Sequence, residues 1–104
     1  MKIPTIKYES EEHFATAMSN HAYDIHMRTL YAINKALNTN NDYVTIAYIE
    51  SDDHTAELGA PDDIWIDNLE KSLDYFEEIE DYSKCQEVVE LIKKLNTDID
   101  ICED

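Results

Sequence analysis

Six acidic side chains recur at steps of three and four residues along one stretch of the chain. They are Asp63, Asp67, Glu70, Asp74, Glu77 and Asp81. At about 100° per residue, these steps place the carboxylates in one stripe of an α-helix, along about 27 Å of its axis. One negative charge every ~5 Å is of the same order as the ~3.4 Å between phosphates along one DNA strand. A row of this kind can occupy a lysine- and arginine-lined groove that normally holds a phosphate backbone.

The same stripe has a second interpretation, as a solvated helix face that keeps the protein soluble. Like charges at these spacings destabilise an isolated helix by about 0.2–0.5 kcal/mol per pair. Lys71, four residues after Asp67, is the one nearby counter-charge in the sequence. The stripe has a single sign, whereas protein surfaces usually mix both signs. Both interpretations stay open at this point.

Other chemistry finds little support in the spacing of the remaining polar residues. The four histidines are His13, His21, His26 and His54. They lack the i,i+4 pair that places two imidazoles on one helix face to bind a transition metal. The acids of residues 52–57 and 98–103 lack the ligand order of a calcium-binding EF-hand loop. There is no glycine-rich phosphate loop or nucleophile elbow, and Cys85 falls on an apolar helix face. We therefore expect no enzymatic activity, no metal and no cofactor.

The overall charge narrows the class of partner. The 104 residues include 24 acidic and 8 basic side chains, a net charge of −16, and 43% are hydrophobic, as in folded proteins. Residues 61–104 hold fifteen acids and four bases, a net of −11. Such a charge repels nucleic acid and anionic membranes, so we expect a basic protein partner and no direct nucleic-acid or membrane contact. The lack of a signal peptide and of a C-x-x-C pair predicts a cytoplasmic protein of a bacterial cell or a phage-infected host.

The expected architecture is a single α+β domain over residues 1–104, mostly helical. Ser10 is typical of a helix N-cap, and the apolar spacing over residues 11–37 predicts one long N-terminal helix, with Ser19 and Asn20 as a candidate interruption. The segments before and after this helix predict the remaining elements. Residues 2–8 predict an edge strand or an extended arm, residues 43–49 a small β element, and residues 51–60 a loop.

The C-terminal part predicts an acidic helical hairpin over residues 61–95. Pro61 is expected at the first helical position, and Ser83 is a candidate cap of the second helix. The acidic tail, residues 96–104, alternates acidic and apolar side chains. It is expected to be either a frayed end or a short strand beside residues 43–49.

Residues 81–95, Asp-Tyr-Ser-Lys-Cys-Gln-Glu-Val-Val-Glu-Leu-Ile-Lys-Lys-Leu, resemble the second half of the UVR-type helical hairpin of bacterial excision-repair proteins. The shared pattern is an acidic and aromatic turn, followed by a helix that ends in isoleucine and leucine, and the likeness covers residues 69–95. The chain departs from the family at Cys85 and Gln86, where the family has alanines, and at Val89, where it usually has arginine. The resemblance implies a hairpin that mediates protein–protein contact.

In composition, the chain is similar to small acidic phage proteins of the anti-restriction and anti-CRISPR type, which mimic DNA. Our leading hypothesis is a non-enzymatic inhibitor whose acidic stripe occupies the DNA- or RNA-binding groove of a host nuclease, restriction, CRISPR or other nucleic-acid-binding protein. The alternative is an adaptor or assembly protein that docks through apolar residues of the hairpin, such as Trp65 and Tyr75. A homodimer, with the stripe facing a second subunit, also stays open.

Overall fold

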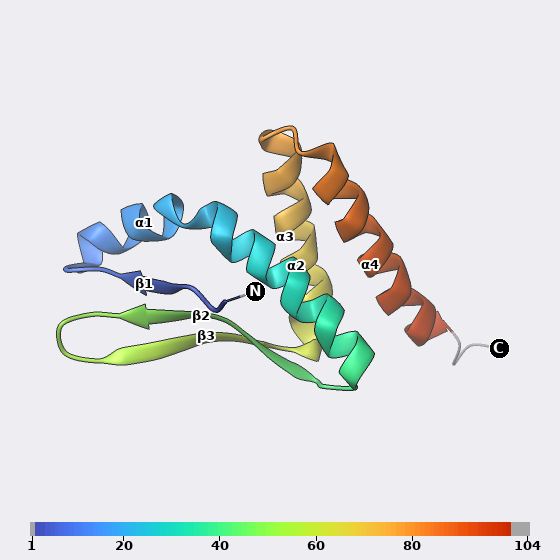
Figure 1. Cartoon of the computed structure of the whole chain (residues 1–104), viewed down its shortest axis with the longest axis horizontal. Helices are drawn as coiled ribbons and strands as arrows, with labels where there is room; N and C mark the ends of the chain where they lie inside the picture. Colours follow the sequence, from blue (N-terminus) through green and yellow to red (C-terminus); the bar gives the residue numbers. More distant parts are fainter. Residues whose placement is uncertain (1, 101–104) are drawn as a thin grey trace. The chain divides into compact units, whose positions relative to one another are not determined.

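The computed structural model describes the backbone of residues 2–100 and the side chains of residues 2–96. The structure is α+β, with a three-stranded sheet and four α-helices in the described residues (Figure 1). The chain divides into two compact units, unit 1 (Met1–Asp62) and unit 2 (Asp63–Asp104). Unit 1 contains the sheet and the first two helices, and unit 2 contains the last two.

The sheet of unit 1 has the strand order β1-β2-β3. Its strands are β1 (Thr5–Lys7), β2 (Tyr43–Glu50) and β3 (Thr55–Pro61). β1 runs parallel to β2, which requires a crossover connection, and the two N-terminal helices supply it. β3 is antiparallel to β2, with a bulge at Ile46. Ile46 and its neighbour Ala47 are both buried at this bulge, whereas in a regular strand successive side chains point to opposite faces of the sheet.

The N-terminal helical region is two helices, α1 (Glu11–Asn20) and α2 (Ala22–Thr39). The Ser10 cap is confirmed, since its Oγ accepts a hydrogen bond from the amide of His13 at 3.2 Å. The expected single long helix is wrong, because the backbone of His21 leaves the helical region at φ −107° and ψ 13°. Its amide closes the end of α1 on Met18, and its carbonyl accepts the amide of Ile25. The break thus lies one residue beyond the polar pair expected to interrupt the helix.

The core of unit 1 forms where α1 and α2 cover one face of the sheet (Figure 1). Ile6 of β1, Ala17 of α1 and Ala47 of β2 are buried together, and larger side chains surround them. On α2, Ile33 is fully buried. The hydrophobic effect on these side chains holds the helices against the sheet.

Residues 55–61 form a strand rather than the expected loop, because their backbone pairs with β2 along its whole length. Pro61 pairs with Tyr43 at the end of β3, where a missing amide proton is tolerated at a sheet edge, so it does not begin a helix. The short 3-10 helix η1 (Asp62–Ile64) follows, and α3 (Trp65–Glu78) begins after it. β-propensity is low for proline and glycine, so local composition concealed this strand.

Unit 2 consists of α3 and α4 (Tyr82–Asp100), which run in opposite directions beside one another (Figure 1). Leu69 and Phe76 of α3 and Val88 of α4 are each 0% exposed. The expected tail is wrong for residues 96–100, which continue α4, while residues 101–104 lie outside the described part. The layout of one long N-terminal helix, a small β element and a hairpin over residues 61–95 is therefore replaced by a βααββ unit followed by a helix pair.

Candidate acidic interface

Four residues of the predicted acidic stripe lie on α3. Asp67, Glu70, Asp74 and Glu77 are all exposed. The buried face of the same helix carries Trp65, Leu69, Ser72 and Phe76. The helix therefore presents a row of four carboxylates along about 15 Å of its axis, on the side away from its buried face.

The other two acids of the predicted stripe lie outside this helix. Asp63 is exposed but belongs to η1, before α3 begins. Asp81 follows α3 and caps α4, because its Oδ1 accepts a hydrogen bond from the amide of Lys84 at 3.3 Å. This cap replaces the expected Ser83 cap. The continuous row is thus shorter than the sequence spacing predicts, since α3 begins after Ile64 and ends at Glu78.

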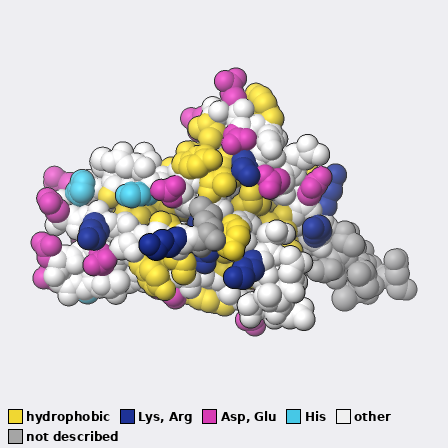
Figure 2. Space-filling model, in the orientation of Figure 1, with side chains coloured by type: hydrophobic (Ala, Val, Ile, Leu, Met, Phe, Trp, Pro, Cys, Tyr) yellow, Lys and Arg dark blue, Asp and Glu magenta, His cyan; other side chains and the backbone are white. Residues whose placement is uncertain are grey.

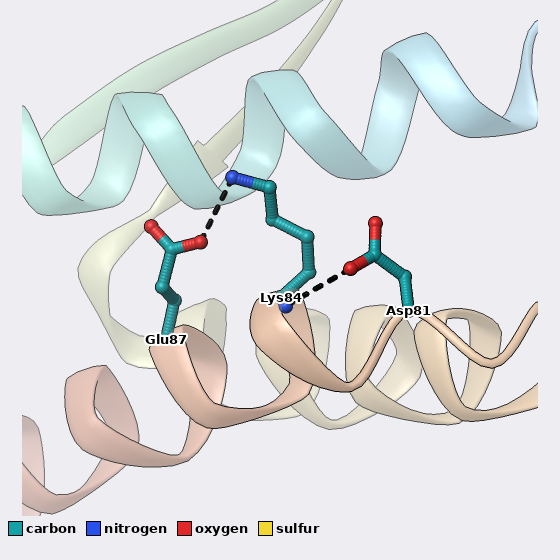
Figure 3. A network of polar contacts seen from close by, with 3 residues as sticks. All are labelled: Asp81, Lys84 and Glu87. Carbon is teal, nitrogen blue, oxygen red and sulfur yellow. Dashed lines mark hydrogen bonds and ion pairs between the residues drawn. The ribbon is translucent and has the colours of Figure 1, made fainter.

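Lys84 is occupied within α4 and does not neutralise the row on α3. Its Nζ lies 2.8 Å from Oε2 of Glu87 (Figure 3). The side chain of Lys84 is 27% exposed and that of Glu87 50%, so water screens this ion pair and it stabilises the fold by little. The expected pair of Lys71 with Asp67 does not form within ion-pair distance, and no such pair involves the four α3 carboxylates in the part of the chain that the structure describes.

Cys85 is placed where a reactive thiolate is disfavoured. Its side chain is half-buried. Burial raises the pKa of the Cys85 thiol, and the carboxylates of Glu77 and Asp81 raise it further because they oppose a second negative charge. The nucleophilic form is therefore scarce at neutral pH.

The two aromatic side chains named as candidate anchors are buried or half-buried. Trp65 is 2% exposed, so a partner cannot reach it in this conformation. Tyr75 is half-buried, and its ring packs edge-on against Phe76 at 5.6 Å. Exposed apolar side chains lie instead at the α3–α4 turn, where Ile79 is 44% and Tyr82 66% exposed. Ile79 directly follows α3 and Tyr82 is the first residue of α4, so both lie at the helix ends next to the turn.

Figure 2 shows where acidic side chains gather on one face of the molecule. In unit 2 they surround the turn between α3 and α4, next to apolar side chains. In unit 1 they gather at the end of the sheet where β2 turns into β3 and where α1 begins. The first turn of α1 contains Glu11 and Glu12. Within residues 2–96, no group of three or more His, Cys, Asp or Glu side chains is arranged to hold a metal ion.

The sheet of unit 1 carries a polar network that the sequence did not predict. The Tyr43 hydroxyl donates to Oε2 of Glu57 and the Thr45 hydroxyl to Oε1, each at 2.9 Å. The hydrogen bond to Glu57 raises the pKa of Tyr43, and some burial and the negative charge of Glu57 add to the rise. The tyrosine lies across Gly59, so that a Cβ there would overlap its hydroxyl. The sequence predicts a loop over residues 51–60, which gives Glu57 and Gly59 no pairing with β2.

Comparison with known proteins adds no relative: no family model, curated protein or solved structure matches the chain. The likeness of residues 69–95 to the UVR-type hairpin therefore stays a local pattern. Among the described residues, no helix has both the length and the apolar character needed to cross a membrane.

Proposed function

We propose that the protein is a non-enzymatic inhibitor that mimics nucleic acid and occupies the basic groove of a nucleic-acid-binding protein. The observation that supports this proposal is the row of four exposed carboxylates on α3, which have no ion-pair partner among the described residues. Unneutralised carboxylates on a helix present fixed negative charge, as a phosphate backbone does. Lysines and arginines of a groove gain charge-assisted hydrogen bonds to them.

The spacing of the row suits this role at short range. Steps of three and four residues put the charges ~5 Å apart, and one helix face holds them in a line. The row spans about 15 Å, comparable to four or five phosphates of one strand at ~3.4 Å each. The net charge of −16 adds long-range attraction to a basic surface and raises the rate of association.

A second candidate function is an adaptor that docks through apolar side chains, and the exposure of Ile79 and Tyr82 favours it. An exposed tyrosine is a common interface anchor. Salt separates the two functions, because association led by charge weakens steeply as ionic strength rises and apolar docking does not.

Affinity capture from bacterial lysate tests the proposal. The bait is the full chain, compared with a variant in which the four α3 acids become amides: Asp67→Asn, Glu70→Gln, Asp74→Asn and Glu77→Gln. A matched control removes four exposed acids of unit 1, by Glu11→Gln, Glu12→Gln, Asp52→Asn and Asp53→Asn, and so changes the net charge equally.

We expect the wild type and the control to capture a nucleic-acid-binding protein that duplex DNA or RNA elutes, and the α3 variant to lose it. A captured protein that nucleic acid does not displace contradicts mimicry. So does equal capture by the α3 variant. If the amount of captured protein does not fall as the salt concentration rises, and Tyr82→Ala abolishes capture, the adaptor function is supported in place of mimicry.

A further inference from the structure

A pocket of about 420 Å³ lies within unit 1, between α2 and the beginning of β2. Its apolar lining includes the buried side chains of Ala32, Ala36 and Val44, together with Ile3. The two alanines leave space because a methyl group is the whole side chain. The volume falls in the range of ~300–1,000 Å³ that is typical of small-molecule sites.

The two charged residues that line the pocket are both basic, although the chain as a whole is acidic. Acidic residues outnumber basic ones by three to one in the sequence. The residues lining the pocket nevertheless include Arg28, which is the one arginine of the chain, and Lys35, with no Asp or Glu among them. Two of the eight basic residues of the chain thus line one pocket, both from α2.

Arg28 is held in a defined position at this site. Its Nε donates to the carbonyl oxygen of Thr45 at 3.1 Å, which ties α2 to β2, and its Cζ lies 5.7 Å from the centre of the Tyr31 ring. A guanidinium carries five N–H donors in a planar fork, the geometry that recognises phosphate oxygens. A cation already ordered by the fold loses less conformational entropy on binding.

Lys35 supplies a second cation on the same wall of the pocket. It lies two helical turns after Arg28, about 10 Å along the axis, so the two long side chains can converge on one anion. Lys35 is exposed, and none of the described carboxylates lies within ion-pair distance of its ammonium. A bound anion therefore does not have to displace an acid of the chain from this lysine.

We propose that this pocket binds a small organic phosphate. The phosphate group, with a charge near −2 at neutral pH, lies between Arg28 and Lys35. The organic part covers Ala32, Ala36 and Val44, since the pocket is larger than an inorganic ion needs. This site is independent of the acidic row, which belongs to the other unit.

Titration of the full chain, followed by backbone amide NMR shifts, tests the site. The probes are inorganic phosphate, ribose 5-phosphate and AMP, so that the contributions of the anion, the sugar and the ring are separated. Lys35→Gln is the test variant, because its exposed side chain can change without loss of packing. Lys71→Gln, an exposed lysine of unit 2, is the matched control.

We expect ribose 5-phosphate or AMP to bind more tightly than inorganic phosphate, with shifts at residues 28–36 and 44–45. Lys35→Gln should weaken this binding about tenfold, as expected for loss of one charge-assisted hydrogen bond, and Lys71→Gln should not. The proposal is overturned if neither organic phosphate binds, if inorganic phosphate binds equally well, if the shifts lie elsewhere, or if both variants bind alike.

Discussion

The amide of Asp81 donates a hydrogen bond to the carbonyl oxygen of Phe76 at 2.9 Å. The amide of Glu80 donates to the carbonyl oxygen of Glu77 at 3.1 Å. These two bonds form a Schellman motif, which ends α3 and starts the turn into α4. The motif places Glu80 in the left-handed region, at φ 61°, where glycine is favoured because any Cβ is strained.

Replacing Glu80 with glycine should stabilise the protein. Glu80→Gly removes the left-handed strain and also a negative charge at a helix C-terminus, and we expect the free energy of unfolding to rise by about 1 kcal/mol. Urea denaturation measures the change. Glu80→Gln is the control, since it removes the charge and keeps the Cβ. If the unfolding free energy of Glu80→Gly is no higher than that of Glu80→Gln, the left-handed backbone at residue 80 is not a source of strain.

Gly59 is required by the tyrosine that lies across it. Gly59→Ala should lower the unfolding temperature by roughly 4 °C, because the new Cβ displaces Tyr43 and breaks its hydrogen bond to Glu57. In a Tyr43→Ala background the same substitution should be neutral or stabilising, since alanine is better than glycine within a strand. Thermal denaturation of the four proteins forms a double-mutant cycle. Equal losses in both backgrounds would show that Tyr43 is not the cause.

His26 should make stability fall on mild acidification. Burial lowers the pKa of His26 from its ordinary 6.5, so the folded state binds this proton more weakly than the unfolded state. Its contribution to stability is complete above the unfolded pKa and is lost as the pH falls through the lowered value. The unfolding free energy of the wild type should therefore drop more between about pH 7 and pH 5 than that of His26→Gln.

An NMR titration checks the cause directly. The His26 ring resonance should titrate with a midpoint below 6.5. A titration midpoint of His26 at or above 6.5 would contradict the explanation that burial of His26 lowers its pKa.

Neutralising the acidic row should stabilise α3. Glu70→Gln, Asp74→Asn and Glu77→Gln together remove four repulsive i,i+3 or i,i+4 pairs within α3, and we expect about 1 kcal/mol of added stability at low salt. Asp67 is kept, because an acid in the first turn favours the helix. Denaturation at low and high ionic strength should show the gain shrinking as salt screens the repulsion. A gain independent of salt contradicts an electrostatic origin.

Local signals predicted the features that depend on a few neighbouring residues. The Ser10 cap and the strand at residues 43–49 are confirmed, and four of the six spaced acids share the exposed face of α3. Helix periodicity and capping act over one or two turns, so the sequence carries them directly. The identity of a partner is not encoded in this way, and the nucleic-acid mimic stays a proposal.

The features that the sequence did not predict depend on pairing between segments that are distant in the chain. Residues 55–61 become a strand because β2 offers its edge, against their weak local propensity, and this pairing moves the start of α3 from Pro61 to Trp65. The same strand brings Glu57 to Tyr43. Seventeen residues separate Arg28 from Thr45, and only the docking of α2 on β2 joins them and forms the pocket. By itself, the sequence determined the acidic character and its helical spacing. The tertiary structure decided where α3 and its row of acids begin and that Arg28 and Lys35 line a pocket, because both depend on contacts between residues far apart in the chain.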